Sequence, residues 1–261
     1  MALDPDTLET LIETVAKFVD ERLIPLEAQV AAEDKIPDTV ISAMAELGLF
    51  GLTIPVEYGG LGLNTEEECR IVMELGRAAP AFRSVIGTNN GIGSQGLVLH
   101  GTAAQRQHYL PKLASGEITG SFALTEPDAG SDSAAISLKA VADANDFLLS
   151  GTKRYITNAT RAQLFTVFAR TDPDERGSRG ISAILVDAST PGISLGSPNK
   201  KMGQQGAHVC DVIFEECRVP QENIIGGAER LNKGFATAMQ TLDRGRIHLS
   251  ALAVGCAQRL I

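Results

Sequence analysis

The sequence predicts an α+β multidomain protein with an N-terminal all-α domain, a middle antiparallel β-sandwich or barrel domain, and the first helix of a truncated C-terminal helical bundle. Two observations predict this fold class. Near both ends, apolar residues recur at three- and four-residue steps, the period of a helix with one buried face. Between them, short apolar runs alternate with turn residues, as is typical of antiparallel strands. We place the domains at residues 1–118, 119–228 and 229–261.

The helical domain is predicted from apolar stripes and capping signals. The first stripe consists of Leu8, Leu11, Ile12, Val15, Phe18 and Val19. Thr65 with Glu68 fits a capping box at the start of a further helix. Thr102 with Gln105 opens another. We expect Pro111 to limit that helix, because proline has no N–H to donate to the helical ladder.

The strands of the middle domain are expected at residues 121–125, 136–141, 147–149, 164–169, 181–186 and 209–214. From Leu231 the helical period returns and continues to Ile261, where the chain ends inside the pattern. A long amphipathic helix needs a partner for its apolar stripe. We expect that partner to lie outside these 261 residues, so the sequence is interpreted as a fragment.

Composition excludes several classes of function. Hydrophobic residues make up 44% of the 261, and the net charge is -9, which argues against a nucleic-acid partner. No apolar run has the length of a membrane span, and the N-terminus has no secretory pattern. The cysteines show no metal-ligand spacing, so no metal is expected. We interpret the four histidines as surface or packing residues: His100, His108, His208 and His248.

Two segments carry the residues of chemical interest. In residues 120–132, a strand turns abruptly into a loop of small residues that exposes backbone N–H groups, which can hold an anion or the polar edge of a flat ring. In residues 151–159, Tyr155 and Thr157 share one face of a strand and could contact such a ring. Taken singly, each segment is better explained as an ordinary hairpin end or strand.

Together the two segments resemble the acyl-CoA dehydrogenase family, which carries a Thr-Glu-Pro-x-x-Gly-Ser-Asp loop and, further along, an aromatic-Ile-Thr-Asn strand. Here these motifs are residues 125–132 and 155–158. Further motifs of the family follow the same order at residues 55–62, 100–111, 201–203, 214–220 and 242–246. The resemblance covers nearly the whole chain, and seven short motifs in the right order are specific to the family.

The resemblance implies FAD as cofactor, with the flavin ring between the β domain and the helices. The expected cofactor contacts are Phe122, Ala123, Leu124, Thr125, Ser131, Tyr155, Ile156 and Thr157. Among them, the Thr157 hydroxyl is expected near flavin N5. The expected substrate contacts are Arg83, Ser84, Ser131, Asp243 and Arg246.

The resemblance also implies α,β-desaturation of an acyl-CoA thioester, in which a carboxylate removes the α proton and the β hydride passes to the flavin. In most of the family that carboxylate is a Glu in the C-terminal helical domain. A minority carry it at the position that is Gly245 here, which cannot act as a base. We therefore assign no catalytic residue, and expect these 261 residues alone to bind FAD weakly without turnover.

The acyl group is suggested by Arg83, which lies in a mostly apolar stretch. A charge there needs a partner or water, although a helix-end Arg often extends past apolar neighbours. Phe82-Arg83-Ser84 resembles the aromatic-Arg-Ser of glutaryl-CoA dehydrogenases, whose Arg holds the terminal carboxylate of the substrate. An acidic acyl tail is therefore expected. A plain fatty or branched acyl-CoA stays the alternative.

The sequence is also compatible with other functions. The same fold serves sulfinate-releasing acyl-CoA lyases and flavin oxidases or monooxygenases, and a non-catalytic binding or scaffold subunit is an alternative of another class. The resemblance further implies electron-transfer flavoprotein as electron acceptor and a homotetramer when full length. Because no Arg-rich leader is present, we expect a bacterial cytoplasmic protein, or one of the mitochondrial matrix if the source is eukaryotic.

Overall fold

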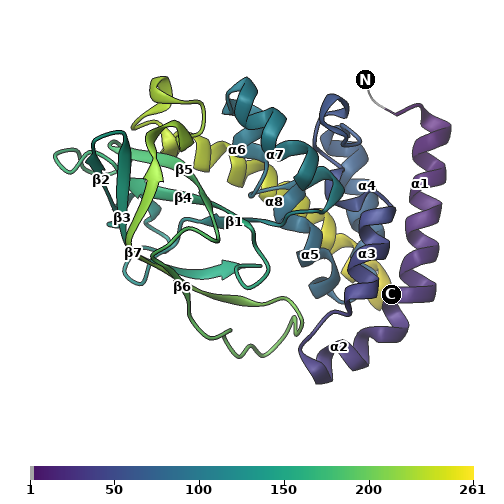
Figure 1. Cartoon of the computed structure of the whole chain (residues 1–261). Coiled ribbons are helices and arrows are strands. Elements are labelled where there is room, and N and C mark those ends of the chain that lie inside the picture. The colour runs from purple at the N-terminus through teal and green to yellow at the C-terminus, as the bar shows by residue number, and fades with distance from the viewer. Residues whose placement is uncertain (1–2) are drawn as a thin grey trace.

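The computed structural model describes residues 3–261 and places a helical half beside a sheet half, with the last helix extending along both (Figure 1). This arrangement confirms the predicted fold class. The helices of the first half are α1 (Pro5–Phe18), α2 (Glu27–Glu33), α3 (Asp38–Glu46), α4 (Thr65–Leu75), α5 (Pro80–Asn90), α6 (Gln95–His100) and α7 (Ala103–Ser115).

Helices α1, α4 and α7 each begin at a capping side chain that accepts from free backbone N–H groups of the first turn. The capping box at Thr102 and Gln105 is confirmed. The box predicted at Thr65 lies one residue earlier, because Asn64 and Glu67 exchange the two hydrogen bonds. The prediction that Pro111 limits its helix is wrong: α7 continues to Ser115, since its buried leucines hold the last turn against the core.

The strands form a single curled sheet rather than two separate layers. They are β1 (Gly120–Ala123), β2 (Lys139–Asp143), β3 (Asp146–Thr157), β4 (Leu164–Arg170), β5 (Ile181–Asp187), β6 (Ile193–Leu195) and β7 (Val209–Pro220). Most pairings are antiparallel, as predicted, but β1 and β2 both run parallel to β4 along one edge. The sheet is therefore mixed, because long connections return the chain to β4 in the same direction.

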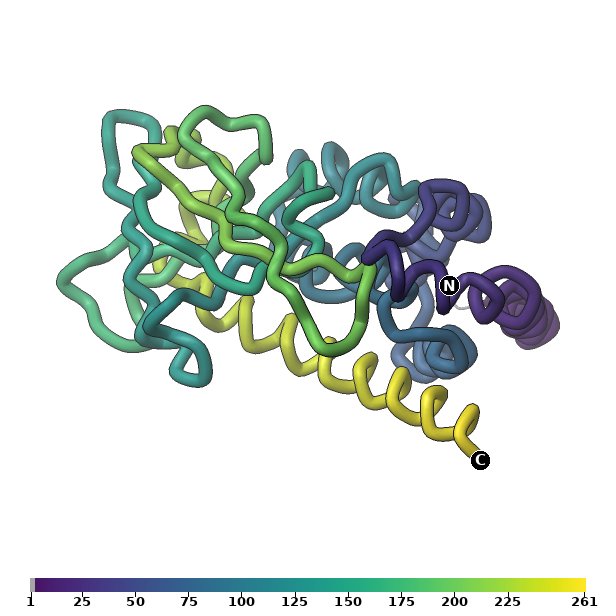
Figure 2. The backbone as a smooth tube through the Cα atoms, turned by 90° about the horizontal axis from the view of Figure 1, so that it is seen from below, coloured from purple at the N-terminus to yellow at the C-terminus, as the bar shows by residue number. Residues whose placement is uncertain are grey.

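Helix α8 (Gly234–Leu260) connects the two halves, and Figure 2 shows it along one side of the molecule. The prediction that its apolar stripe lacks a partner in this chain is wrong for one face. Ala238 packs in the core between sheet and helices, while Ala251 and Leu252 pack against Val72 of α4. The helices touch where Gly76 faces Gly255.

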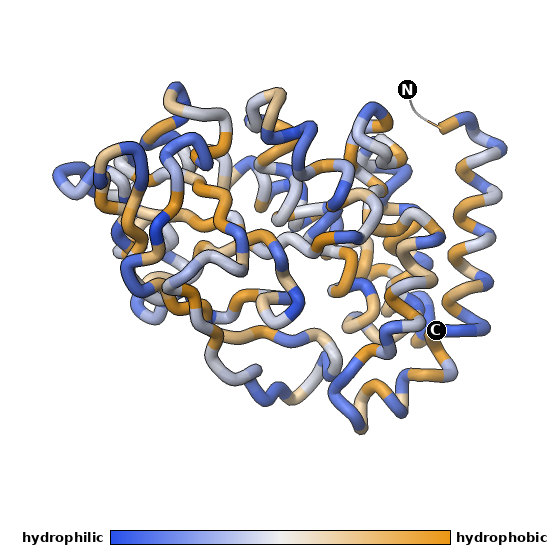
Figure 3. Tube along the Cα trace, in the orientation of Figure 1, coloured by the Kyte–Doolittle hydropathy of each residue, from blue (hydrophilic) through white to orange (hydrophobic). Residues whose placement is uncertain are grey.

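The hydropathy pattern agrees with this packing. Apolar residues recur along the helices and central strands, whereas hydrophilic residues gather in the outlying loops (Figure 3). One large core lies among the N-terminal helices and a second lies within the curl of the sheet. The faces between them enclose the site described next.

Candidate functional site

Two adjacent cavities lie between the sheet, α5 and α8. The larger has a volume of about 450 Å³ and the smaller about 280 Å³. Both are lined by Ile92, Thr157, Leu242 and Arg246, so they are neighbours that share a wall.

The larger cavity gathers most of the predicted cofactor residues. Seven of the eight line its wall: Phe122, Leu124, Thr125, Ser131, Tyr155, Ile156 and Thr157. Ala123 does not, because alternate residues of β1 face opposite sides and Ala123 is fully buried within the sheet. Among residues 3–261, the Thr125 N–H and the Thr157 hydroxyl donate to no protein acceptor, which leaves both for a ligand.

The irregular end of β3 orients Tyr155, Ile156 and Thr157 toward the larger cavity. A bulge interrupts its pairing with β7 between Lys153 and Ile156, and Tyr155 has a φ of 57°. A bulge turns a side chain away from its regular direction, so the Tyr155 ring stands out 59% exposed. The Asn158 amide then donates to Ser84 O and Thr88 Oγ1, both at 2.9 Å, which fixes the strand end against α5.

A buried ion pair braces the loop that follows β1. Lys153 Nζ lies 2.7 Å from Glu126 Oε1, and the two side chains are 0% and 5% exposed. Glu126 also accepts from the backbone N–H groups of Ser137 and Leu138. Burial lowers the pKa of Lys153 to about 8, although the Glu126 carboxylate opposes the shift. The sequence pattern placed Glu126 in the loop motif but did not reveal this bracing role.

The smaller cavity holds the Arg83 side chain at its wall, together with Ser84 and Gln204. Arg83 Nε donates to His248 Nε2 at 2.7 Å. Within residues 3–261, neither Nη1 nor Nη2 makes a hydrogen bond to the protein. The guanidinium lies over Gly87, where an added Cβ would be 2.7 Å from Nη1. Burial lowers the pKa of Arg83 to about 10, and the Glu68 charge opposes this, so the group stays cationic at neutral pH.

Behind Arg83, His248 and Glu68 are each 2% exposed and lie 2.7 Å apart, from Nδ1 to Oε1. Arg244 Nη2 approaches the other Glu68 oxygen at 3.5 Å. The interpretation of His248 as a packing or surface residue missed this network. No local pattern reveals it, because its members stand on α4, α5 and α8.

The remaining predicted substrate residues divide between the cavities. Ser84 lines the smaller cavity and Ser131 the larger, while Arg246 lines both. Asp243 lines neither, because its carboxylate turns outward and pairs with Arg246, each side chain 70% exposed.

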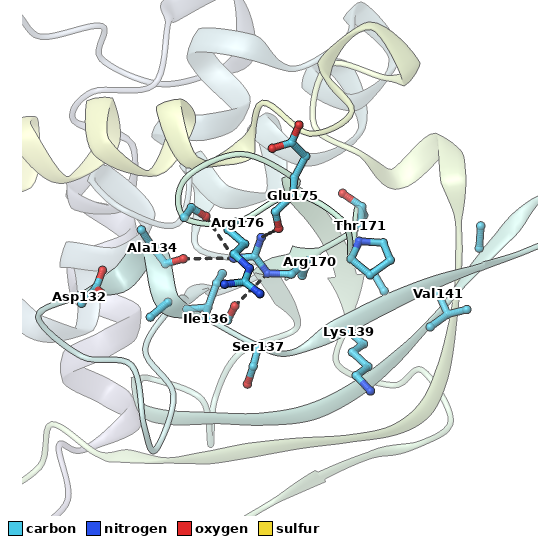
Figure 4. A pocket seen from close by; sticks show the side chains of 15 residues that line it. Asp132, Ala134, Ile136, Ser137, Lys139, Val141, Arg170, Thr171, Glu175 and Arg176 are labelled. Carbon is cyan, nitrogen blue, oxygen red and sulfur yellow. Dashed lines mark hydrogen bonds between the residues drawn. The ribbon is translucent and has the colours of Figure 1, made fainter.

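A separate hollow of about 860 Å³ lies beyond the loop at Asp132 (Figure 4). Arg170 stands in its wall, but its guanidinium donates to five backbone carbonyls, among them those of Ala134 and Ile136. The Arg170 guanidinium therefore holds the surrounding loops together and has a structural role. Within residues 3–261, no cluster of three or more His, Cys, Asp or Glu is placed to hold a metal ion. No helix in that range is long and apolar enough to cross a membrane.

Comparisons with known proteins agree with the two halves of the fold. The family model "Acyl-CoA dehydrogenase, N-terminal domain" matches residues 5–117, and "Acyl-CoA dehydrogenase, middle domain" matches residues 121–217. Among solved structures, the glutaryl-coenzyme A dehydrogenase glutaryl-CoA complex superposes with a TM-score of 0.88 at 32% identity, covering 99% of this chain and 65% of that one.

Two curated relatives are similar along nearly the whole chain. The acryloyl-CoA reductase (NADH) of Anaerotignum propionicum is 39% identical over 97% of this chain and 64% of its own length. The mitochondrial short-chain specific acyl-CoA dehydrogenase of Mus musculus is 37% identical over 97% of this chain and 61% of its own length. The chain thus spans less than two thirds of either relative.

Proposed function

Because the chain belongs to the acyl-CoA dehydrogenase family, we propose that it forms the flavin- and acyl-CoA-binding part of an FAD-dependent enzyme that desaturates an acyl-CoA thioester. The two adjacent cavities support this proposal, since neighbouring spaces with a shared wall suit a flat cofactor and an acyl chain that must meet. Thr157, which lines both, stands where the two ligands would meet.

The larger cavity suits FAD. Its wall combines apolar contacts from Phe122 and Ile156 with the free Thr125 N–H and Thr157 hydroxyl, as a flat ring with a polar edge requires. Bound FAD would supply the hydride acceptor. Ser131 and the loop around it would hold the more polar part of the cofactor or of CoA. Flavin-binding measurements on Thr157 and Ser131 variants test these assignments.

The substrate of this site is proposed to be an acyl-CoA with a short acidic tail. The observation that carries this is the Arg83 guanidinium, which reaches the smaller cavity with Nη1 and Nη2 unpaired among residues 3–261. A partly buried cation is stabilised by an acceptor, and a planar guanidinium matches both oxygens of a carboxylate. Thr157 also lines this cavity, whose volume of about 280 Å³ favours a short acyl chain.

Replacing Arg83 with Lys is expected to weaken binding of glutaryl-CoA by about 10- to 100-fold and of butyryl-CoA by less than about twofold. Lysine keeps a positive charge but loses the planar fork. The measurement is a titration of the FAD-loaded chain with each thioester, followed by the flavin spectrum and by calorimetry. Arg218→Lys, on an exposed ion pair of β7, is the control. Equal losses for both thioesters would contradict the acidic tail.

Replacing Gly87 with Ala is expected to displace Arg83 without unfolding the protein. The new Cβ would meet Nη1 at 2.7 Å, and a flexible side-chain end can move aside. Alanine also favours the helix by about 1 kcal/mol over glycine. Glutaryl-CoA binding should therefore fall about tenfold while the urea midpoint of unfolding stays level or rises. Unchanged glutaryl-CoA affinity would show that the contact with Gly87 does not place the guanidinium.

The partners follow from the same proposal. We propose electron-transfer flavoprotein as electron acceptor and a homotetramer for the full-length enzyme, in a bacterial cytoplasm or mitochondrial matrix. Family resemblance supports these three proposals. Reoxidation of the substrate-reduced enzyme by electron-transfer flavoprotein, compared with reoxidation by O₂, would separate a dehydrogenase from an oxidase, and sulfite release from a sulfinate-bearing thioester would identify a lyase.

A further inference from the structure

A buried chain of hydrogen bonds continues from Arg83 away from the cavity. Arg83 Nε contacts His248 Nε2 at 2.7 Å, and His248 Nδ1 contacts Glu68 Oε1 at 2.7 Å. His248 and Glu68 are each 2% exposed and neither lines the cavity. They therefore act on a ligand only through Arg83.

The direction of these bonds follows from the donors available. An arginine nitrogen can only donate, so His248 Nε2 must be the accepting, unprotonated nitrogen. The proton of the neutral ring then sits on Nδ1 and is donated to the Glu68 carboxylate. Burial lowers the pKa of His248, which keeps this neutral form at physiological pH.

We propose that His248 is the positioning residue for Arg83 and thereby sets the preference of this site for acidic acyl tails. With Nε held from behind, only the Nη1 and Nη2 edge of the guanidinium remains to meet a ligand. That edge carries two parallel N–H groups and binds a carboxylate in a bidentate manner. Glu68 holds the imidazole in the tautomer that this requires. The inference rests on the acidic substrate proposed above.

The charges around the network favour the same ligand. Arg83 and Arg244 each carry a positive charge, and the buried Glu68 carboxylate pairs with Arg244 but is linked to Arg83 only through the neutral His248. Arg246 lines the cavity as well but pairs with Asp243 at the surface. One positive charge is left without a buried counterion, and the carboxylate of an acidic tail would balance it.

Three variants of His248, each in the FAD-loaded full chain, test the proposal with glutaryl-CoA and butyryl-CoA as probes. His248→Leu removes the acceptor and should lower the preference for glutaryl-CoA over butyryl-CoA by about tenfold or more. His248→Gln should restore most of it, because the amide oxygen reaches the place of Nε2. His248→Asn, whose amide is too short, should behave like His248→Leu and replaces it if that variant fails to fold.

The outcomes separate this inference from the proposed function. A wild-type chain without preference for glutaryl-CoA would overturn both. A preference that Arg83→Lys abolishes but that His248→Leu and His248→Asn leave intact would overturn the inference alone. Equal weakening of both thioesters in every variant would mean that His248 only supports the fold. Loss in the leucine and asparagine variants with recovery in the glutamine variant would establish the positioning role.

Discussion

Replacement of Lys153 with Met is expected to lower the free energy of unfolding by about 3–5 kcal/mol, the cost of leaving a buried carboxylate without its partner. Lys153 is 0% exposed and Glu126 5% exposed, so water cannot replace the lost ammonium group. The loop after β1 should loosen as well, because Glu126 accepts from Ser137 and Leu138 there. Urea unfolding of the chain at pH 7 measures the effect.

The double variant Lys153→Met with Glu126→Gln is the matched control. No charge is then stranded, and the amide oxygen can accept from one of the two backbone N–H groups, which Glu126 binds through different oxygens. The double variant should recover part of the stability that the single variant loses, because one backbone N–H group still lacks its acceptor. If the single variant is as stable as the wild type, Glu126 is neutral or hydrated and the pair does not brace the loop.

Replacement of Gly255 with Ala is expected to separate α8 from α4 and to destabilise the chain by about 1–3 kcal/mol. An added Cβ would lie 2.0 Å from Met73 O and 3.0 Å from Gly76 Cα. These are backbone atoms of α4 and of the residue that caps its C-terminus, so no side chain can move to make room. Hydrogen exchange along both helices, together with urea unfolding, measures the loss of packing.

Gly245→Ala on the same helix is the control. Its Cβ would meet only the tip of Ile92 at 3.4 Å, an ordinary contact. Since alanine favours a helix interior by about 1 kcal/mol over glycine, this variant should be as stable as the wild type or more so. Similar losses of stability in both variants would indicate that α8 is destabilised by any substitution. The close contact with α4 at Gly255 would then not be the cause.

Much of the architecture was predictable from local pattern. The apolar stripe from Leu8 to Val19 predicted a helix, and the alternation after Thr119 predicted strands, because burial of one face imposes a period of about 3.6 or 2 residues. The order of short motifs indicated the family. Pairing direction was not predictable, since the parallel placement of β1 beside β4 depends on connections that periodicity does not encode.

The candidate site divides in the same way. Thr125, Ser131 and Thr157 could be chosen from the sequence because they stand in contiguous motifs, and the structure places all three at one cavity. Ala123 and Asp243 could not be excluded from sequence, because only packing decides which way each side chain faces.

By itself, the sequence determined the two kinds of secondary structure, the motif loop and an arginine in an apolar setting. Only the tertiary structure decided what that arginine meets. Glu68 and His248 are 180 residues apart and enter one buried network with Arg83 because α4, α5 and α8 pack together. Local periodicity reports which face of a helix is buried, and contacts between faces of different helices are a property of the fold.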